Sequence, residues 1–356
     1  MLLKRHTAQH QLLCIKTNLQ EENKMKISLF VTKRLVDGIF GEKYFARLRK
    51  YGDLAIYDRD DFEDRAYALD FVKGSDIIIT SWGTPVIDKE IIDLCPDLKG
   101  VFHAAGTIKP IMSDELLARR DIRLTASAIA IGEGVAESAL AFAISACKGA
   151  FTMPRHTRAG EWNAHNADEV IDFYDIKVGI ISAGFVGRHM IKLLHNFHVD
   201  VLVYDPTLTK EQIAELGAEK RELNELLAES DVISIHSPDI PQTRHIINKD
   251  NIGLLKDRVV IVNTARGTIF DEPYLIERLK EKKGMFACID ITEVEPPAAD
   301  NELRFLDNVN LTPHLAGTAN NGRRRIALHI CEETDRFFAG EKMRTEVDRD
   351  TLSKMA

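Results

Sequence analysis

The chain has 356 residues, of which 45% are hydrophobic and 29% charged, and its formal net charge is -8. This length exceeds the ~100 to 200 residues of one domain, so we expect two domains. The acidic balance argues against a nucleic-acid or membrane-surface partner, because binding a polyanion needs a concentrated basic face. Five scattered cysteines without a CxxC pair indicate buried thiols in a reducing compartment such as the cytoplasm, with no metal site.

Residues 1–24 form a polar N-terminal extension with charges of both signs. They lack the apolar segment of a secretory signal, so we expect them to be disordered, with weak organelle targeting as the alternative. Met25 opens the first strand pattern and is a candidate for the true start of the chain.

From residue 25 to 128, short apolar runs alternate with longer amphipathic segments. This alternation predicts a parallel sheet with crossover helices, and the apolar runs are 27–31, 54–57, 76–80, 100–105 and 122–125. The alanine-rich stretch from Val135 to Ile144 then predicts a helix. Because this helix is apolar nearly all round, we expect it to be buried between domains or in a dimer contact.

A second alternation starts at Lys177. It predicts six strands and intervening helices, which is what a complete doubly wound dinucleotide-binding sheet requires; the strands are 177–181, 201–204, 232–236, 258–262, 286–290 and 308–312. Residues 322–340 predict one amphipathic helix. The predicted fold class is therefore α/β, with two doubly wound parallel-sheet domains.

A glycine turn joins the strand at 177–181 to a helix predicted over 188–197. In the G-x-G-x-x-G pattern of dinucleotide-binding turns, Ser182 replaces the first glycine, whereas Gly184 and Gly187 keep the other two. A pyrophosphate can still bind the amides at the helix N-terminus. The alternative is an ordinary strand-turn-helix whose glycines serve packing.

Asp205 follows the next strand, 18 residues after Gly187. A carboxylate there accepts hydrogen bonds from the ribose hydroxyls and repels a 2'-phosphate. No arginine stands in residues 206–209 to receive that phosphate. The pattern therefore predicts NAD rather than NADP, unless Asp205 is only a turn residue.

Three later strand ends carry the groups that reduction of a 2-oxo acid needs. Arg266 suits the anchoring of a carboxylate and the polarisation of a carbonyl, and His314 suits proton transfer. Glu295 suits the orientation of the histidine ring. Taken singly these residues read as a surface ion pair, a core histidine and a solvated acid. Together, after a nucleotide-binding pattern, they favour catalysis.

These segments resemble the D-isomer-specific 2-hydroxyacid dehydrogenase family, over residues 25–345 and most specifically over 231–318. The resemblance implies that Arg266 binds the substrate, that Glu295 is the partner of the histidine and that His314 is the acid/base. It also implies a set of residues that line the cofactor: Gly184, Phe185, Val186, Gly187, Asp205, Ser237, Pro238, Thr264, Ala265 and Asp290.

The resemblance further implies a domain organisation. A flavodoxin-like substrate domain, residues 25–128 plus 318–345, would receive an inserted Rossmann NAD domain at 129–317. The helix from Val135 would be a dimer element, giving a homodimer that acts on a small 2-oxo acid to form the D-2-hydroxy acid. The segment from Thr312 to Gly317 is most similar to members acting on glyoxylate or hydroxypyruvate.

The chain departs from the family at Ser182 and in the loop 103–110, which has one glycine. In that loop Ala105 and Gly106 are the expected substrate contacts. His103 and Lys109 either favour a more anionic substrate or are surface groups. The family's formate dehydrogenases pair their histidine with glutamine, so Glu295 disfavours that activity. An NAD(H)-sensing regulator on the same fold is the alternative function.

Overall fold

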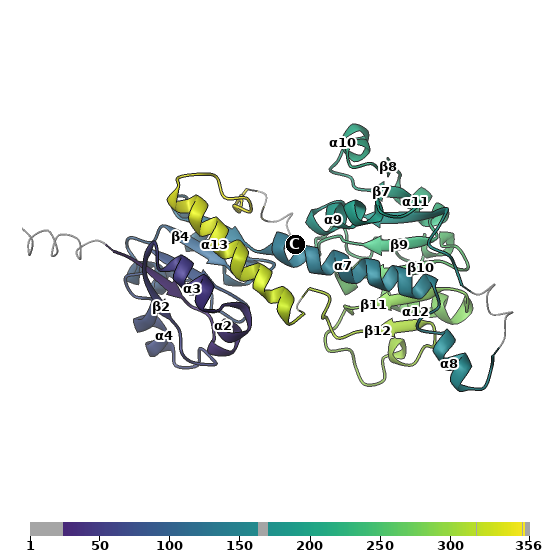
Figure 1. Cartoon of the computed structure of the whole chain (residues 1–356), viewed down its shortest axis with the longest axis horizontal. Coiled ribbons are helices and arrows are strands. Elements are labelled where there is room, and N and C mark those ends of the chain that lie inside the picture. Colours follow the sequence, from purple (N-terminus) through teal and green to yellow (C-terminus); the bar gives the residue numbers. More distant parts are fainter. Residues whose placement is uncertain (1–23, 163–169, 318, 351, 353–356) are drawn as a thin grey trace, which may run out of the picture. The chain divides into compact units, whose positions relative to one another are not determined.

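The computed structural model describes residues 24–162, 170–317, 319–350 and 352, which belong to two compact α/β units (Figure 1). Among the described residues, the first unit contains 24–128 and those from Arg323 to Leu352, and the second contains those from Ile129 to Gly322. The second unit is therefore an insertion in the first. The expected N-terminal extension lies outside the described residues except for Lys24.

The first unit is built on a five-stranded parallel sheet. Its strand order is β2-β1-β3-β4-β5, with β1 (Met25–Leu29), β2 (Gly52–Ile56), β3 (Ile77–Thr80), β4 (Gly100–His103) and β5 (Arg123–Ala126). All four residues of β3 are buried, as expected where helices cover both faces of a parallel sheet. This order is the flavodoxin-like arrangement, so the predicted fold class is confirmed for this unit.

Six α-helices of the described residues complete the first unit. They are α2 (Lys33–Ile39), α3 (Glu42–Leu48), α4 (Arg65–Val72), α5 (Lys89–Leu94), α6 (Asp114–Ala118) and α13 (Arg324–Phe338). The C-terminal helix α13 packs against α2 and α3. The fully buried Glu333 of α13 accepts hydrogen bonds from the Thr125 hydroxyl and from the backbone amides of Arg344 and Thr345. This network fixes the segment after α13 to β5.

The second unit contains a seven-stranded parallel sheet of order β12-β11-β10-β9-β6-β7-β8. The strands are β6 (Ile176–Ile181), β7 (Val199–Tyr204), β8 (Glu219–Lys220), β9 (Val232–Ile235), β10 (Val260–Asn263), β11 (Phe286–Ile289) and β12 (Val309–Leu311). The predicted doubly wound sheet is confirmed. The two-residue edge strand β8 was not predicted, because a charged pair carries no apolar pattern.

Two hydrophobic clusters cover the two faces of this sheet. One contains residues of α7 (Ala128–Cys147), α9 (Phe185–Leu194) and α10 (Lys210–Glu215). The other contains residues of α11 (Leu223–Glu229), α12 (Glu272–Glu281) and the short helix Ile252–Leu254. Alternate strand residues face the two clusters, as Val260 and Val262 do on one side and Ile261 on the other. A short helix, α8 (Met153–Arg158), follows α7.

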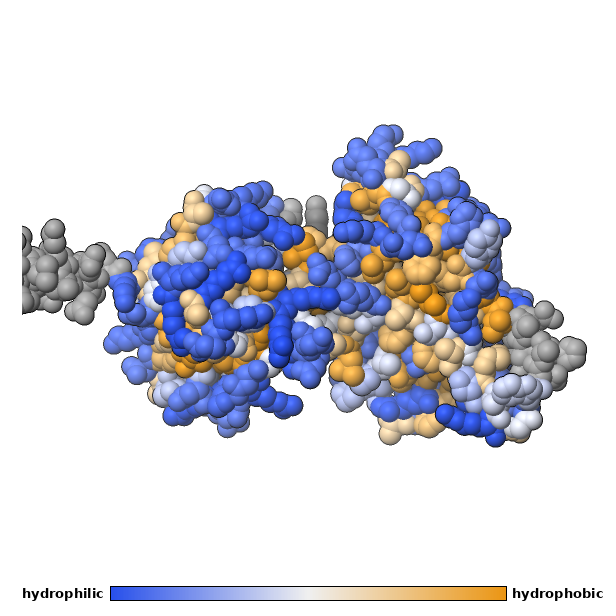
Figure 2. All heavy atoms as spheres, in the orientation of Figure 1, coloured by the Kyte–Doolittle hydropathy of each residue, from blue (hydrophilic) through white to orange (hydrophobic). Residues whose placement is uncertain are grey.

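Helix α7 is only partly buried in the single chain, and its expected burial between domains or in a dimer contact stays a prediction. Its alanine face, Ala136, Ala139 and Ala143, packs on the sheet, but Phe142 and Ile144 are only partly covered. Figure 2 shows hydrophobic side chains on this side of the second unit. Among the described helices α7 alone is long and apolar enough to cross a membrane, and one face of it packs on the sheet.

Candidate active site

The glycine turn lies where the strand order of the second unit reverses, between β6 and β9. Helix α9 begins at Phe185, three residues before the predicted start, so Phe185, Val186 and Gly187 form its first turn and Gly184 is its N-cap. A Cβ built at Gly184 would meet no atom within 4 Å. Because first-turn amides have no partner inside a helix, this open space suits a phosphate.

Ser182 keeps the turn geometry that glycine usually provides. Its φ of 75° lies in the left-handed region, and its amide donates to the Tyr204 carbonyl at 2.8 Å. A Cβ at Gly187 would lie 2.1 Å from the Ser182 carbonyl oxygen. Gly187 therefore allows the close approach of helix and strand. The turn keeps its geometry although Ser182 stands in place of the first glycine.

Asp205 connects the end of β7 to this turn. Its carboxylate is buried and accepts hydrogen bonds from the Ala183 amide at 2.9 Å and from the Thr207 amide at 2.8 Å. The Thr207 hydroxyl donates to the same oxygen at 2.6 Å. Oδ1 thus accepts both Thr207 bonds, whereas Oδ2 accepts only the Ala183 amide and keeps a lone pair, so Asp205 can hold the turn and still accept a ribose hydroxyl.

The other predicted cofactor residues lie at the ends of β9 and β10. The Ser237 hydroxyl donates to the Ile181 carbonyl at 3.5 Å, and Pro238 follows it. Thr264 is 5% exposed, and its hydroxyl has no hydrogen-bond partner among the described residues. An orphaned buried hydroxyl and the open space at Gly184 are features that a dinucleotide would complete, so the residues present fit NAD.

His314 and Glu295 form a direct pair. The His314 Nδ1 lies 3.0 Å from the Glu295 Oε2, and the imidazole is half exposed. The backbone amide of His314 donates to the Asp290 carbonyl at 2.9 Å. The Asp290 carboxylate is buried and accepts the amides of Leu315 at 3.0 Å and Ala316 at 2.9 Å. Asp290 therefore holds the loop that carries His314.

Arg266 lies on the neighbouring strand end, after β10. The Asn263 side chain spans this turn, since its amide group donates to the Arg266 carbonyl and its oxygen accepts the Ala265 amide. A Cβ at Gly267 would lie 2.0 Å from the Thr292 carbonyl carbon. The Arg266 loop thus packs directly against the segment that ends in Glu295, and the loops bearing the three predicted catalytic residues follow the adjacent strands β10, β11 and β12.

A second histidine–glutamate pair supports the same segment and was missed by sequence reasoning. His245 Nε2 lies 3.1 Å from Glu293 Oε1, and the Glu293 amide donates to Glu272 at 3.3 Å. The position of Glu293 two residues before Glu295 was the available signal. No sequence signal pointed to His245, because it lies 48 residues away from Glu293 in the sequence.

Ala105 and Gly106 lie in the first unit, directly after β4. Ala105 is buried, and its carbonyl accepts the Ser127 amide at 2.9 Å. His103 is 2% exposed, its Nδ1 lies 2.9 Å from the Thr80 hydroxyl, and burial lowers its pKa to about 4. His103 is therefore uncharged at neutral pH, and neither expectation for it was right: it is not a surface group and adds no charge to a pocket.

The doubly wound sheet, the glycine turn and the buried acid after the second strand define the second unit as a dinucleotide-binding domain. Its residues 140–316 match the family model for the D-isomer specific 2-hydroxyacid dehydrogenase NAD-binding domain. The chain belongs to the D-isomer-specific 2-hydroxyacid dehydrogenase family, and this domain binds NAD.

Two curated relatives are similar in sequence to most of this chain. The chain is 31% identical over 274 residues to D-3-phosphoglycerate dehydrogenase of Methanocaldococcus jannaschii, covering 77% of this chain and 52% of the relative. It thus spans about half the length of that protein. It is 28% identical over 320 residues to glyoxylate reductase of Korarchaeum cryptofilum, and the match covers 89% of this chain and 94% of the relative.

A solved structure shares the fold. The NAD-complexed D-isomer specific 2-hydroxyacid dehydrogenase from Lactobacillus delbrueckii ssp. bulgaricus superposes with a TM-score of 0.75 at 18% identity. The match covers 91% of this chain and all of the other.

Proposed function

We propose that this chain is an NAD-dependent oxidoreductase that transfers a hydride between NADH and a small 2-oxo acid, giving the D-2-hydroxy acid, and catalyses the reverse reaction. The observation that carries the proposal is the 3.0 Å pair of His314 and Glu295, on strand-end loops beside the loop of Arg266. A proton donor, its orienting carboxylate and a guanidinium are the groups this reaction requires.

The second unit holds the cofactor in this proposal. Gly184, Phe185, Val186 and Gly187 would bind the pyrophosphate, and Asp205 would bind the ribose. Five further residues would line the site: Ser237, Pro238, Thr264, Ala265 and Asp290. Bound NADH supplies the hydride that reduces the carbonyl carbon. The buried carboxylate of Asp205 leads us to expect NADH to be preferred over NADPH.

The chain's own residues handle the substrate and the proton. Arg266 grips the carboxylate and polarises the C2 carbonyl, and the amides at Ala105 and Gly106 receive the carboxylate. Because Glu295 engages Nδ1 of His314, Nε2 faces the reaction and gives its proton to the C2 oxygen as the carbon is reduced. In the reverse direction His314 accepts that proton.

Assembly and location are further parts of the proposal. The partly covered apolar side of α7, with Phe142 and Ile144, supports a homodimer formed through this helix. We place the enzyme in the cytoplasm. From the family resemblance alone, glyoxylate or hydroxypyruvate is the predicted substrate.

The test is NADH oxidation at 340 nm with a panel of 2-oxo acids, for wild type, His314→Ala and a control, His156→Ala. His156 also pairs with a glutamate, Glu161 at 2.6 Å, but on α8. We expect His314→Ala to lower kcat by about 100-fold or more while NADH binding persists, and His156→Ala to keep full activity. If wild type binds NADH but reduces no acid, the NAD(H)-sensing regulator becomes the better explanation.

A further inference from the structure

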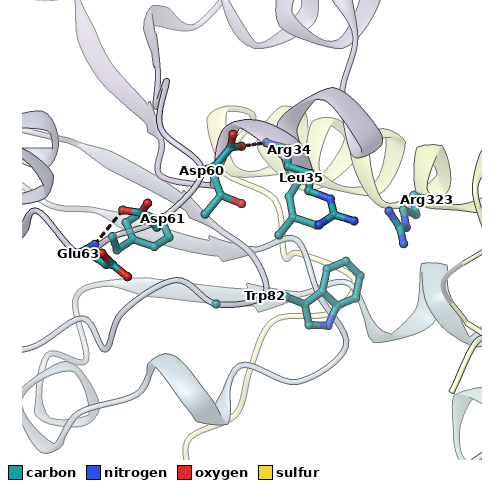
Figure 3. Close-up of a pocket in the computed structure, with 10 residues that line it drawn as sticks. Arg34, Leu35, Asp60, Asp61, Glu63, Trp82 and Arg323 are labelled. Carbon is teal, nitrogen blue, oxygen red and sulfur yellow. Dashed lines mark hydrogen bonds between the residues drawn. The ribbon is translucent and has the colours of Figure 1, made fainter. Parts of the chain in front are cut away.

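A pocket opens in the first unit at the carboxyl ends of β1, β2 and β3 (Figure 3). Its volume is about 590 Å³, and its lining includes Arg34, Leu35, Asp60, Phe62, Trp82 and Arg323. In the order β2-β1-β3-β4-β5 the chain reverses direction across the sheet between β1 and β3. Doubly wound sheets bind their ligands at this reversal. The proposed function gives the pocket no role.

The charges of the pocket are divided between its two ends (Figure 3). Asp61 and Glu63 lie at one end, and Arg34 and Arg323 lie toward the other, beside the Trp82 indole, with Asp60 next to Arg34. The Asp60 carboxylate accepts the Arg34 backbone amide at 2.9 Å. The guanidinium of Arg34, in contrast, has no ion pair or hydrogen bond with any residue that the structure describes. The planar Arg34 guanidinium is therefore available to bind a carboxylate in the pocket.

The pocket adjoins the loop that we expect to receive the substrate carboxylate. Ser81, the neighbour of Trp82, donates its hydroxyl proton to the Ala104 carbonyl at 2.9 Å, and Ala105 follows directly. A substrate whose carboxylate rests on Ala105 and Gly106 thus has a second compartment beside it, within the same unit and along the same edge of the sheet.

We propose that this pocket is the subsite for the distal end of the 2-oxo acid, and that Arg34 selects a substrate with a second carboxylate there. The inference rests on the proposed function and names its substrate class, a 2-oxo dicarboxylic acid. A guanidinium matches the planar geometry of a carboxylate. The acidic side chains at the other end disfavour a dianionic phosphate. Glyoxylate has no distal group to fill this volume, so the pocket favours a longer acid than the resemblance does.

The test compares kcat/KM for 2-oxoglutarate and for 2-oxopentanoate, which has the same five-carbon chain without the second charge. The variants are Arg34→Gln, Arg34→Lys and the control Arg324→Gln, which removes an exposed charge of the same unit outside the pocket lining. We expect wild type to prefer 2-oxoglutarate by about tenfold or more. Arg34→Gln should remove that preference and leave 2-oxopentanoate within about twofold. Arg34→Lys should restore part of it, and Arg324→Gln should change neither substrate.

Three results would overturn this assignment. Equal kcat/KM for the two acids with wild type shows that the pocket does not recognise the second carboxylate. An equal loss for both acids in Arg34→Gln shows that Arg34 is only structural. A clear preference for a phosphorylated 2-oxo acid assigns the subsite to phosphate instead.

Binding of glutarate separates the two proposals, because glutarate lacks the reducible carbonyl. We expect calorimetry on the full chain with NADH to detect glutarate, and Arg34→Gln to weaken its binding by about tenfold. If this holds while no 2-oxo acid is reduced, the proposed function fails and the pocket stands as a dicarboxylate site. If 2-oxopentanoate is reduced but glutarate does not bind, the pocket proposal alone fails.

Discussion

Gly267→Ala should separate the Arg266 loop from the segment that carries Glu295. A Cβ at residue 267 would lie 2.0 Å from the Thr292 carbonyl carbon, where ordinary contacts begin at 3.4 Å, so the two backbones must part by about 1.4 Å. Overpacking of this kind costs about 3 kcal/mol of unfolding free energy. A misplacement of ~1 Å between catalytic groups lowers the rate by about 100-fold.

Urea unfolding and the NADH assay together measure both effects. Gly253→Ala is the matched control, because a Cβ there meets no atom within 4 Å, and we expect it to change stability by less than about 0.5 kcal/mol. A Gly267→Ala protein with wild-type unfolding midpoint and wild-type kcat/KM would refute the close approach of these loops. Lost stability with unchanged activity would refute the link from this contact to Glu295.

Three further changes test the turn, the cofactor and a buried histidine. Ser182→Gly should stabilise the protein by up to about 1 kcal/mol in urea unfolding, because relief of the left-handed φ of 75° slightly exceeds the entropy that glycine adds to the unfolded chain. Wild type should prefer NADH to NADPH. Asp205→Ala should reduce that preference and weaken NADH binding, since the Ala183 amide loses its acceptor. Equal use of both cofactors by wild type would contradict this role of Asp205. As the pH falls from about 6.5 to about 4, the unfolded chain protonates His103 before the folded chain does, so stability falls by about 3 kcal/mol. His103→Gln should remove that part of the pH dependence, and an unchanged profile would show that His103 is not buried in its neutral form.

The sequence predicts the fold well where apolar patterns are long and regular. All five strands of the first unit and six strands of the second correspond to predicted apolar runs. The prediction fails where tertiary contacts decide the outcome. The α9 helix begins at Phe185 rather than Arg188 because Gly184 serves as the N-cap, and β8 forms only by pairing with β7.

The candidate site shows the same division. The adjacency of the loops with Arg266, Glu295 and His314 follows from the order of parallel strands, since neighbouring strand ends share one edge. Three other features depend on contacts between residues far apart in the sequence. His245 pairs with Glu293, Asp290 holds the loop of His314, and His103 is buried. Such contacts leave no periodic signal in one sequence.

The first unit is made of two separate chain segments, so it cannot finish folding until the second segment has been synthesised. The second unit is one continuous stretch, Ile129–Gly322, and can form its core once that stretch has emerged from the ribosome. The β-sheet of the first unit emerges earlier but must wait for α13 and for the Glu333 network with Thr125, which are made after the second unit. Nascent chains halted before Arg323 should therefore expose the apolar face that α13 covers and depend on chaperones to keep it from aggregating.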